Sequence, residues 1–234
     1  MNISIAYEPL TAPQALRARL SERLPGMGVA CTDIAGDPQA LYPEEFEAIR
    51  NAVPRRQREF AAGRQAARQA MAQIGWPPAA IPSAADRSPI WPKGLAGSIS
   101  HTRQACVAVV GPRETVHSIG IDLENDVPMD PALWGTICTP AETAFVNTQP
   151  VALQGRLVTW LFSAKEAFYK WQYPRTRRML EFQDVCVRLA QPGFPVRFQI
   201  SMTANPSAVH AEGHCMACHE HLVAWVIGHA PPSP

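Results

Sequence analysis

Apolar residues in the first half of the chain recur at helical spacing in two places. Leu16 and Leu20 fall on one side of a predicted short helix over residues 13–24, which Pro25-Gly26 ends. Four apolar residues at helical spacing predict a longer helix over residues 55–74: Phe60, Ala67, Met71 and Ile74. A further helix is predicted to open at residues 42–45, where proline is followed by two acids. Strands are predicted at residues 1–7, 27–34 and 105–111.

The second half combines a two-faced strand with a long helix. Side chains alternate along a strand, so Asp122 and Glu124 should point to one face of residues 120–124, with apolar neighbours behind. The next long apolar stretch predicts a central helix over residues 157–171 that stops near Pro174. A short helix at 140–146 and strands at 182–189, 196–202 and 222–228 complete the prediction.

The mixture of predicted helices and strands indicates an α+β fold. There is also a faint internal echo: Val107-Ala108-Val109-Val110-Gly111 resembles Val223-Ala224-Trp225-Val226-Ile227-Gly228. Each run closes a segment that carries a helix and strands, which suits two α+β halves of similar plan. The match is too short to prove a duplication.

Composition narrows the class of protein. The 234 residues suffice for a buried core, and 47% of them are apolar. With 21 basic and 20 acidic residues the formal charge is +1, so no overall field recruits nucleic acid or a membrane. No apolar run is long enough to cross a bilayer, and the first ten residues lack the pattern of a secretory signal. The six scattered cysteines then predict reduced thiols and a cytoplasmic protein.

The acidic strand and the central helix together indicate chemistry on a phosphorylated substrate. Asp122 and Glu124 on one face repel each other unless a cation lies between them, and oxygen-only ligands suit Mg²⁺. Glu166 and Lys170, one turn apart, add a carboxylate and a cation for phosphate. The alternative is structural: acidic pairs also occur at solvated strand ends, and Glu–Lys pairs one turn apart are common surface ion pairs.

A third stretch, residues 86–101, could bind phosphate through backbone N–H groups, hydroxyls and the cations Arg87 or Lys93. Its glycine and lysine spacing differs from that of a P-loop. His101 at its end has the alternative role of a hydrogen-bonded core residue. On the arginine-rich helix, Arg56 and Arg58 are expected to lie on a solvated face.

A competing motif lies near the end of the chain. The run His214-Cys215-Met216-Ala217-Cys218-His219 contains the CxxCH pattern of covalent haem attachment, and its side chains are also permitted zinc ligands. Haem attachment happens outside the cytoplasm, and a structural zinc site normally draws its ligands from two separate segments. A hairpin turn beside the last strand is therefore the favoured interpretation.

Four stretches in order make the sequence resemble the 4′-phosphopantetheinyl transferase superfamily, and within it the branch of enterobactin-synthase component D. They are Glu59-Phe60-Ala61-Ala62-Gly63-Arg64-Gln65-Ala66-Ala67, Trp91-Pro92 with Gly97-Ser98-Ile99-Ser100-His101, Gly120-Ile121-Asp122-Leu123-Glu124, and Phe162-Ser163-Ala164-Lys165-Glu166-Ala167-Phe168-Tyr169-Lys170. The motifs cover residues 55 to 171, and we expect residues 1–40 and the tail after 190 to add nothing to the resemblance.

The resemblance implies transfer of phosphopantetheine from coenzyme A to the serine of a carrier-protein domain, with release of 3′,5′-ADP. By motif position, Asp122, Glu124 and Glu166 would hold Mg²⁺ on the pyrophosphate, and Glu166 would also act as the catalytic base, directly or through a metal-bound water. The residues that the resemblance places on coenzyme A are Arg55, Arg64, Arg87, Ser88, Ser100, His101, Lys165 and Lys170. For Lys165, exposure on the helix surface is the alternative.

The family fold implied by the resemblance is a pseudodimer of two similar α/β halves with the active site between them. We expect the halves to be residues 1–115 and 116–234, with the metal and catalytic motifs in the second half, and the protein to be a monomer. Two alternatives stay open: a non-catalytic module that binds coenzyme A or a carrier protein, and a metal-binding regulator that uses the terminal Cys/His cluster. The sequence does not reveal which carrier is served.

Overall fold

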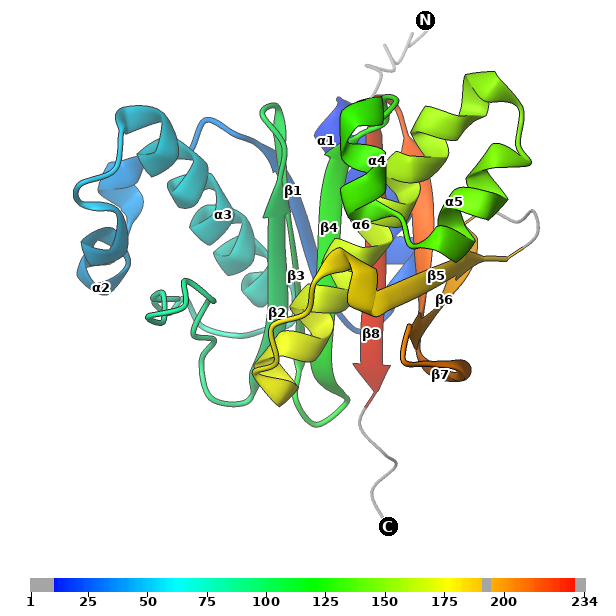
Figure 1. Cartoon of the computed structure of the whole chain (residues 1–234). Coiled ribbons are helices and arrows are strands. Elements are labelled where there is room, and N and C mark those ends of the chain that lie inside the picture. The colour runs from blue at the N-terminus through cyan, green and yellow to red at the C-terminus, as the bar shows by residue number, and fades with distance from the viewer. Residues whose placement is uncertain (1–10, 191–194, 230–234) are drawn as a thin grey trace, which may run out of the picture.

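The computed structural model describes residues 11–190 and 195–229 and contains two antiparallel sheets (Figure 1). The first sheet has the order β1-β3-β2, with β1 at Gly28–Asp33, β2 at Leu95–His101 and β3 at Ala105–Pro112. The second has the order β4-β8-β7-β6-β5: β4 Val116–Asn125, β8 His221–His229, β7 Asn205–Cys218, β6 Val196–Met202 and β5 Val185–Leu189. Helices and antiparallel strands together agree with the predicted α+β class.

Three helices cover the sheets. Helix α3 (Pro54–Gln73) packs on one face of the first sheet, and α6 (Val151–Thr176) packs on the corresponding face of the second (Figure 1). Helix α1 (Ala12–Arg23) lies behind both sheets in this view, and its Leu16 and Leu20 share one core with residues of β3, β4 and β8. The shorter helices are α2 (Pro43–Phe46), α4 (Pro131–Ile137) and α5 (Pro140–Asn147).

The two sheets meet where β2 lies beside β4. Here the hydroxyls of Ser98 and Ser100 accept hydrogen bonds from the backbone N–H groups of Ile121 and Leu123, at 3.1 and 3.2 Å. Both serines are buried, so these bonds give partners to backbone N–H groups that would otherwise be left unpaired, at a cost in free energy. Side-chain hydroxyls of one sheet thus join it to the edge strand of the other.

Helix α6 is fixed against β4 in a regular register. Ser163 donates to the carboxylate of Asp122, the carbonyl of Ala167 packs on Gly120, and the carbonyl of Trp171 accepts from Ser118. Steps of four residues on the helix, about 6 Å, thus match steps of two residues on the strand, about 6.7 Å. This match places the acidic face of β4 directly beside the helix.

Most predicted elements are confirmed, but α6 is longer than predicted and three elements were not predicted. Helix α6 begins at Val151, earlier than predicted, and continues through Pro174 to Thr176. Strands β2 and β7 and helix α4 were not predicted; the outer half of β7 is largely exposed, so it has no buried face to produce alternation. The Cys/His run forms the predicted hairpin, in which Cys218 of β7 pairs with His221 of β8.

Two sequence expectations concern the ends of the chain and membranes. The strand predicted at residues 1–7 lies outside the described residues. Among residues 11–190 and 195–229, no helix combines the length and apolar character needed to cross a bilayer. All six cysteines are free thiols, as the sequence predicts.

The close approach of α6 to β4 makes a stability prediction. A Cβ at Gly120 would overlap the Ala167 carbonyl oxygen, so Gly120→Ala must push the helix away from the strand. We expect it to lower the free energy of unfolding by about 1–3 kcal/mol, the usual cost of overpacking. Gly135→Ala in α4 is the control, because its Cβ would meet nothing within 4 Å. Equal urea midpoints for the two variants would contradict this packing.

Candidate active site

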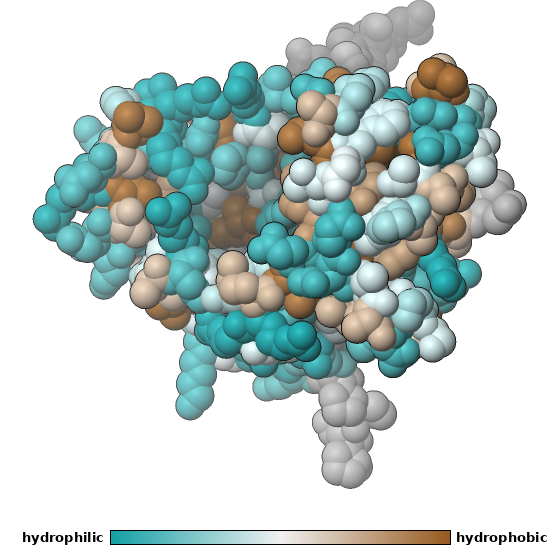
Figure 2. Space-filling model, viewed as in Figure 1, coloured by the Kyte–Doolittle hydropathy of each residue, from teal (hydrophilic) through white to brown (hydrophobic). Residues whose placement is uncertain are grey.

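A cleft of about 930 Å³ lies between the first sheet with α3 and the second sheet with α6. Its lining comes from α3, residues 84–91, strands β2 and β4, and the C-terminal half of α6. Figure 2 shows the hollow between the part that carries α2 and α3 and the part that carries α6, with hydrophilic side chains around it. The three motif regions predicted to act together therefore face one cavity.

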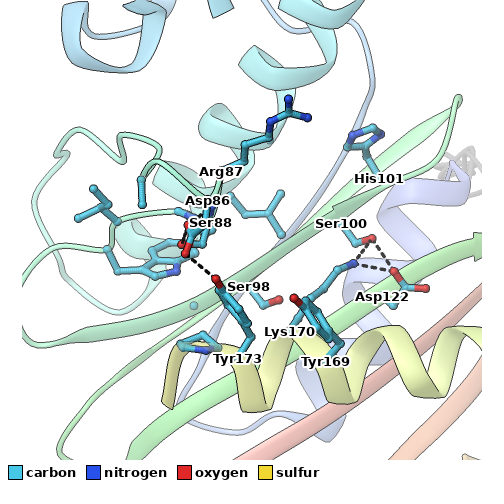
Figure 3. Close-up of a pocket in the computed structure, with 18 of the residues that line it drawn as sticks. Asp86, Arg87, Ser88, Ser98, Ser100, His101, Asp122, Tyr169, Lys170 and Tyr173 are labelled. Atoms are coloured by element: carbon cyan, nitrogen blue, oxygen red, sulfur yellow. Dashed lines mark hydrogen bonds and ion pairs between the residues drawn. The ribbon is translucent and has the colours of Figure 1, made fainter. Parts of the chain in front are cut away.

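Asp122 lies at the bottom of this cleft and is 3% exposed. Its Oδ1 accepts hydrogen bonds from Lys170 Nζ at 2.6 Å and from Ser100 Oγ at 3.0 Å (Figure 3). Its Oδ2 accepts from Ser163 Oγ at 2.9 Å. A buried carboxylate is stable only with such partners, and these partners come from β2 and α6. Asp122 therefore ties together the three elements that carry the motifs.

The other two predicted metal ligands are carboxylates held in unfavourable surroundings. Burial, followed by the charge of Asp122, raises the pKa of Glu124 to about 7. Burial, and to a smaller extent Asp122, also raises the pKa of Glu166, whereas the Lys170 ammonium lowers it. Glu124 lines the cleft; Glu166 is half-buried on α6 and is not among its lining residues. The three carboxylates act on one another electrostatically, so an added cation would relieve their repulsion.

No three side chains of His, Cys, Asp or Glu among the described residues converge closely enough to hold a metal by themselves. Mg²⁺ does not require such a cage, because it usually takes one or two carboxylates and completes its shell with water and substrate phosphate. The donor set of Asp122, Glu124 and Glu166 consists only of hard oxygens. Its chemistry fits Mg²⁺ better than a softer metal.

The loop of residues 83–89 forms one wall of the cleft. Asp86 Oδ1 accepts from the Ser88 backbone N–H and hydroxyl, and its Oδ2 accepts from Tyr173 of α6 and from Arg177, which directly follows this helix, both at 2.8 Å. The Ser88 hydrogen bonds, followed by that from Tyr173, lower the pKa of Asp86 to about 2. Arg87, between Asp86 and Ser88, has a left-handed φ of 66°, which is uncommon for a non-glycine residue. Figure 3 shows its side chain extending from this loop.

The predicted phosphate ligands lie on two sides of the cavity. Lys170 and Ser100 reach its floor beside Asp122, and His101 lines it at the end of β2. The Nδ1 of His101 faces the Thr102 carbonyl, and its Nε2 lies 3.1 Å from Arg56. These partners make Nδ1 the donor and Nε2 the acceptor. Arg56 is exposed, as the sequence predicts, and it also lines the cleft.

Two other predicted arginines have partners within the protein. Arg64 is buried and donates to the Ile81 carbonyl at 2.7 Å and to Ser83 at 3.1 Å; burial lowers its pKa to about 10. It lines the cleft and also supports the wall loop. Arg55 pairs with Glu59 at 2.8 Å and is not among the lining residues.

Lys165 requires a correction, because the structure places it away from the cleft. Its side chain is 1% exposed and forms an ion pair of 2.7 Å with Glu142 of α5. Consecutive helical residues point about 100° apart, so Lys165 points to a different side of α6 from Glu166. Neither predicted position for Lys165, on coenzyme A or on the helix surface, agrees with this burial.

Sequence reasoning missed several lining residues, among them Asp86, Arg113, Tyr169, Tyr173 and Arg177. The rings of Tyr169 and Tyr173 stack at a centroid distance of 5.4 Å. Their positions, one turn apart beside Glu166 and Lys170, provided the signal that could have identified them. Asp86 and Arg113 lie on loops, for which no periodicity is available.

Comparison with known proteins identifies the family. The model of the 4′-phosphopantetheinyl transferase N-terminal domain matches residues 44–111, and that of the 4′-phosphopantetheinyl transferase superfamily matches residues 118–226. The 4′-phosphopantetheinyl transferase PptT of Mycobacterium tuberculosis is 40% identical over 159 residues, which cover 67% of this chain and 69% of PptT. The chain belongs to the 4′-phosphopantetheinyl transferase superfamily.

Two other relatives match similar shares of the chain. The transferase Npt of Nocardia iowensis is 35% identical over 67% of this chain and 71% of its own length. Enterobactin synthase component D of Salmonella typhimurium is 32% identical over 73% of this chain and 65% of its own length. The predicted family and branch are confirmed. The superfamily match continues to residue 226, so the expectation that the tail after 190 adds nothing was wrong.

The raised pKa of Glu124 makes a prediction about stability and pH. Its folded pKa of about 7 exceeds the ordinary value of 4.5, so the folded protein binds the proton more tightly than the unfolded chain. Ionising Glu124 therefore lowers the free energy of unfolding. This loss of stability is absent below about pH 4.5 and complete above about pH 7. In chelator at pH 8, Glu124→Gln should therefore raise Tm by at least about 2 °C, with the gain shrinking toward pH 5.

Glu114→Gln, at an exposed position, is the control and should leave Tm unchanged at both pH values. A Tm for Glu124→Gln that equals the wild-type value at pH 8 would show that the Glu124 carboxylate is not strained in the folded protein.

Proposed function

We propose that the transferase moves 4′-phosphopantetheine from coenzyme A to a serine of an acyl or peptidyl carrier protein and releases 3′,5′-ADP. The observation that carries this proposal is the floor of the cleft, where Asp122, Lys170 and Ser100 meet within 3.0 Å of one another. A carboxylate for a cation and an ammonium for phosphate are thereby held at one point. The proposed halves are residues 1–115 and 116–234, in one monomeric pseudodimer.

The cleft suits the size and charge of coenzyme A. Its volume of about 930 Å³ is at the upper end of the range for small-molecule sites. Cationic or donor groups stand around it: Lys170 on the floor, Arg56 beside His101 at the end of β2, and Arg87 with Ser88 on the wall loop. In our proposal these groups bind the phosphates, while Arg64 mainly supports the loop. Arg55 would contribute to the positive potential near α3.

Asp122, Glu124 and Glu166 would hold Mg²⁺. When bound, Mg²⁺ would supply positive charge for the negative charge that develops as the phosphoryl group is transferred. Support comes from the raised pKa values of Glu124 and Glu166, which are caused first by burial and then by the charge of neighbouring carboxylates. Asp122, whose oxygens accept three hydrogen bonds, would stay fixed and orient the remaining ligands.

Glu166 would accept the proton of the carrier serine, directly or through an intervening water. The serine Oγ forms a bond to the phosphorus next to the pantetheine arm, and the bond from that phosphorus to the bridging pyrophosphate oxygen breaks. That oxygen leaves with 3′,5′-ADP. A raised pKa supports the role of base, because a carboxylate of higher pKa holds the serine proton more strongly.

Mass spectrometry of apo-carrier proteins tests the proposal. After incubation with coenzyme A and Mg²⁺, a carrier serine should gain one phosphopantetheine, and excess chelator should prevent it. Carriers of siderophore or other secondary-metabolite synthetases are the first candidates, given the name of the enterobactin relative. Asp122→Ala and Asp122→Asn should abolish transfer, whereas Asp33→Ala, at an exposed strand end, should not. Full activity in chelator would reject the metal assignment.

Glu166→Gln separates the two roles of Glu166. The amide keeps the size and one oxygen ligand but lacks basicity, so coenzyme A and Mg²⁺ should still bind through Asp122 and Glu124. Loss of general-base catalysis should lower kcat by roughly 10²- to 10⁴-fold. Because the base acts in the chemical step, KM for coenzyme A should change far less.

Glu166→Ala, which also removes the oxygen ligand, is the comparison and should weaken binding as well. Calorimetry of coenzyme A binding accompanies the kinetics of both variants. Near-full kcat in Glu166→Gln would assign the proton to another acceptor.

A further inference from the structure

The Lys165 ammonium has a complete and unusually specific set of partners. It donates to the Ile137 carbonyl at 2.8 Å, to Glu142 Oε2 at 2.7 Å and to the Phe182 carbonyl at 2.8 Å. Three donors thus meet three acceptors from three different segments: the end of α4, α5 and the turn before β5. The three hydrogen bonds therefore fix both where the Lys165 ammonium lies and how it is oriented.

Glu142 extends the same network. Its Oε2 also accepts from the Thr139 backbone N–H, and its Oε1 accepts from the Val187 backbone N–H, each at 2.7 Å. Both side chains of the Lys165–Glu142 pair are 1% exposed. One ion pair, with Lys165 in α6 and Glu142 in α5, therefore binds four backbone groups around α6.

Helix α6 is thus fixed on two sides. Against β4 it is held by Ser163 and Trp171, with Ala167 packed on Gly120 between them. The contacts with β4 set the position of the helix along the strand. The Lys165 contacts lie on another side and resist rotation about the helix axis.

We propose that Lys165 is a positioning residue for catalysis, which sets the rotation of α6 so that Glu166 and Lys170 face Asp122. The inference rests on the proposed function, because it assumes that Glu166 and Lys170 act in the transfer. A buried ion pair is often no more stabilising than an apolar pair of the same volume. What the ion pair adds here is direction, since three acceptors surround one ammonium.

A small rotation of α6 about its axis is enough to change the rate strongly. Side-chain ends lie about 5–6 Å from a helix axis, so a rotation of about 10° displaces them by about 1 Å. A misplacement of about 1 Å at a reacting group can cost about 10²-fold in rate. The helix needs to roll only slightly for Glu166 to lose its alignment.

The test compares stability with turnover in matched variants. Lys165→Met leaves Glu142 buried without its counter-ion and should lower Tm strongly. The double variant Lys165→Met/Glu142→Gln removes both charges and should regain most of the Tm. If Lys165 sets the rotation, kcat per folded enzyme stays about 10- to 100-fold below the wild type in the double variant. Leu16→Ala, in the core behind the sheets, is the control: Tm falls, but kcat is kept.

The pH profile supplies a readout that stability alone does not move. The acidic side of the profile of kcat against pH should shift in the double variant, because Glu166 changes its distance from Asp122 and Lys170. Wild-type kcat and an unshifted acidic side of the profile in the double variant would overturn the proposal, as would an equal loss of kcat in Leu16→Ala. An inactive wild-type enzyme would instead reject the proposed function itself.

Glu142→Gln alone covers the case in which the double variant does not fold. Lys165 keeps its two carbonyl acceptors but loses the charged one, so the same decrease in kcat is expected in milder form. Wild-type kcat and an unshifted acidic side of the profile in this variant would likewise overturn the proposal.

Discussion

The buried carboxylate of Asp122 is the interaction on which the rest of the site depends. Its oxygens accept from Ser100 of β2 and from Ser163 and Lys170 of α6, so one side chain of β4 joins both sheets and the central helix. An uncompensated charge at this depth would be too costly to bury. The elements that carry the motifs are therefore bound to the same side chain that we propose as a metal ligand.

Much of the site could be predicted because it follows local periodicity. Alternation along β4 placed Asp122 and Glu124 on one face, and a spacing of four residues placed Glu166 near Lys170. The same periodicity could not show which side of α6 meets the cleft, since rotation of a helix depends on its tertiary partners. Lys165 was misplaced for that reason. Asp86 and Arg113 had no periodic signal, and the exposed half of β7 had no buried face.

The cleft concentrates functional charge at a cost in stability. Glu124 and Glu166 are both held in surroundings that favour their neutral forms, and the Lys170 ammonium opposes this effect. Elsewhere buried charges are paired closely, as in Lys165–Glu142 and Arg68–Glu45. The contrast separates residues that stabilise the fold from the carboxylates to which we assign a metal ion.

The serine hydroxyls between the sheets have a consequence for how opening of the cleft can be observed. The amide hydrogens of Ile121 and Leu123 are bonded to acceptors that belong to the other sheet. Such hydrogens exchange with solvent deuterons only when β2 and β4 separate, whereas a hydrogen bonded within its own sheet needs local unfolding. These two amides are natural reporters, inside the backbone itself, of the frequency with which the two parts of the molecule move apart.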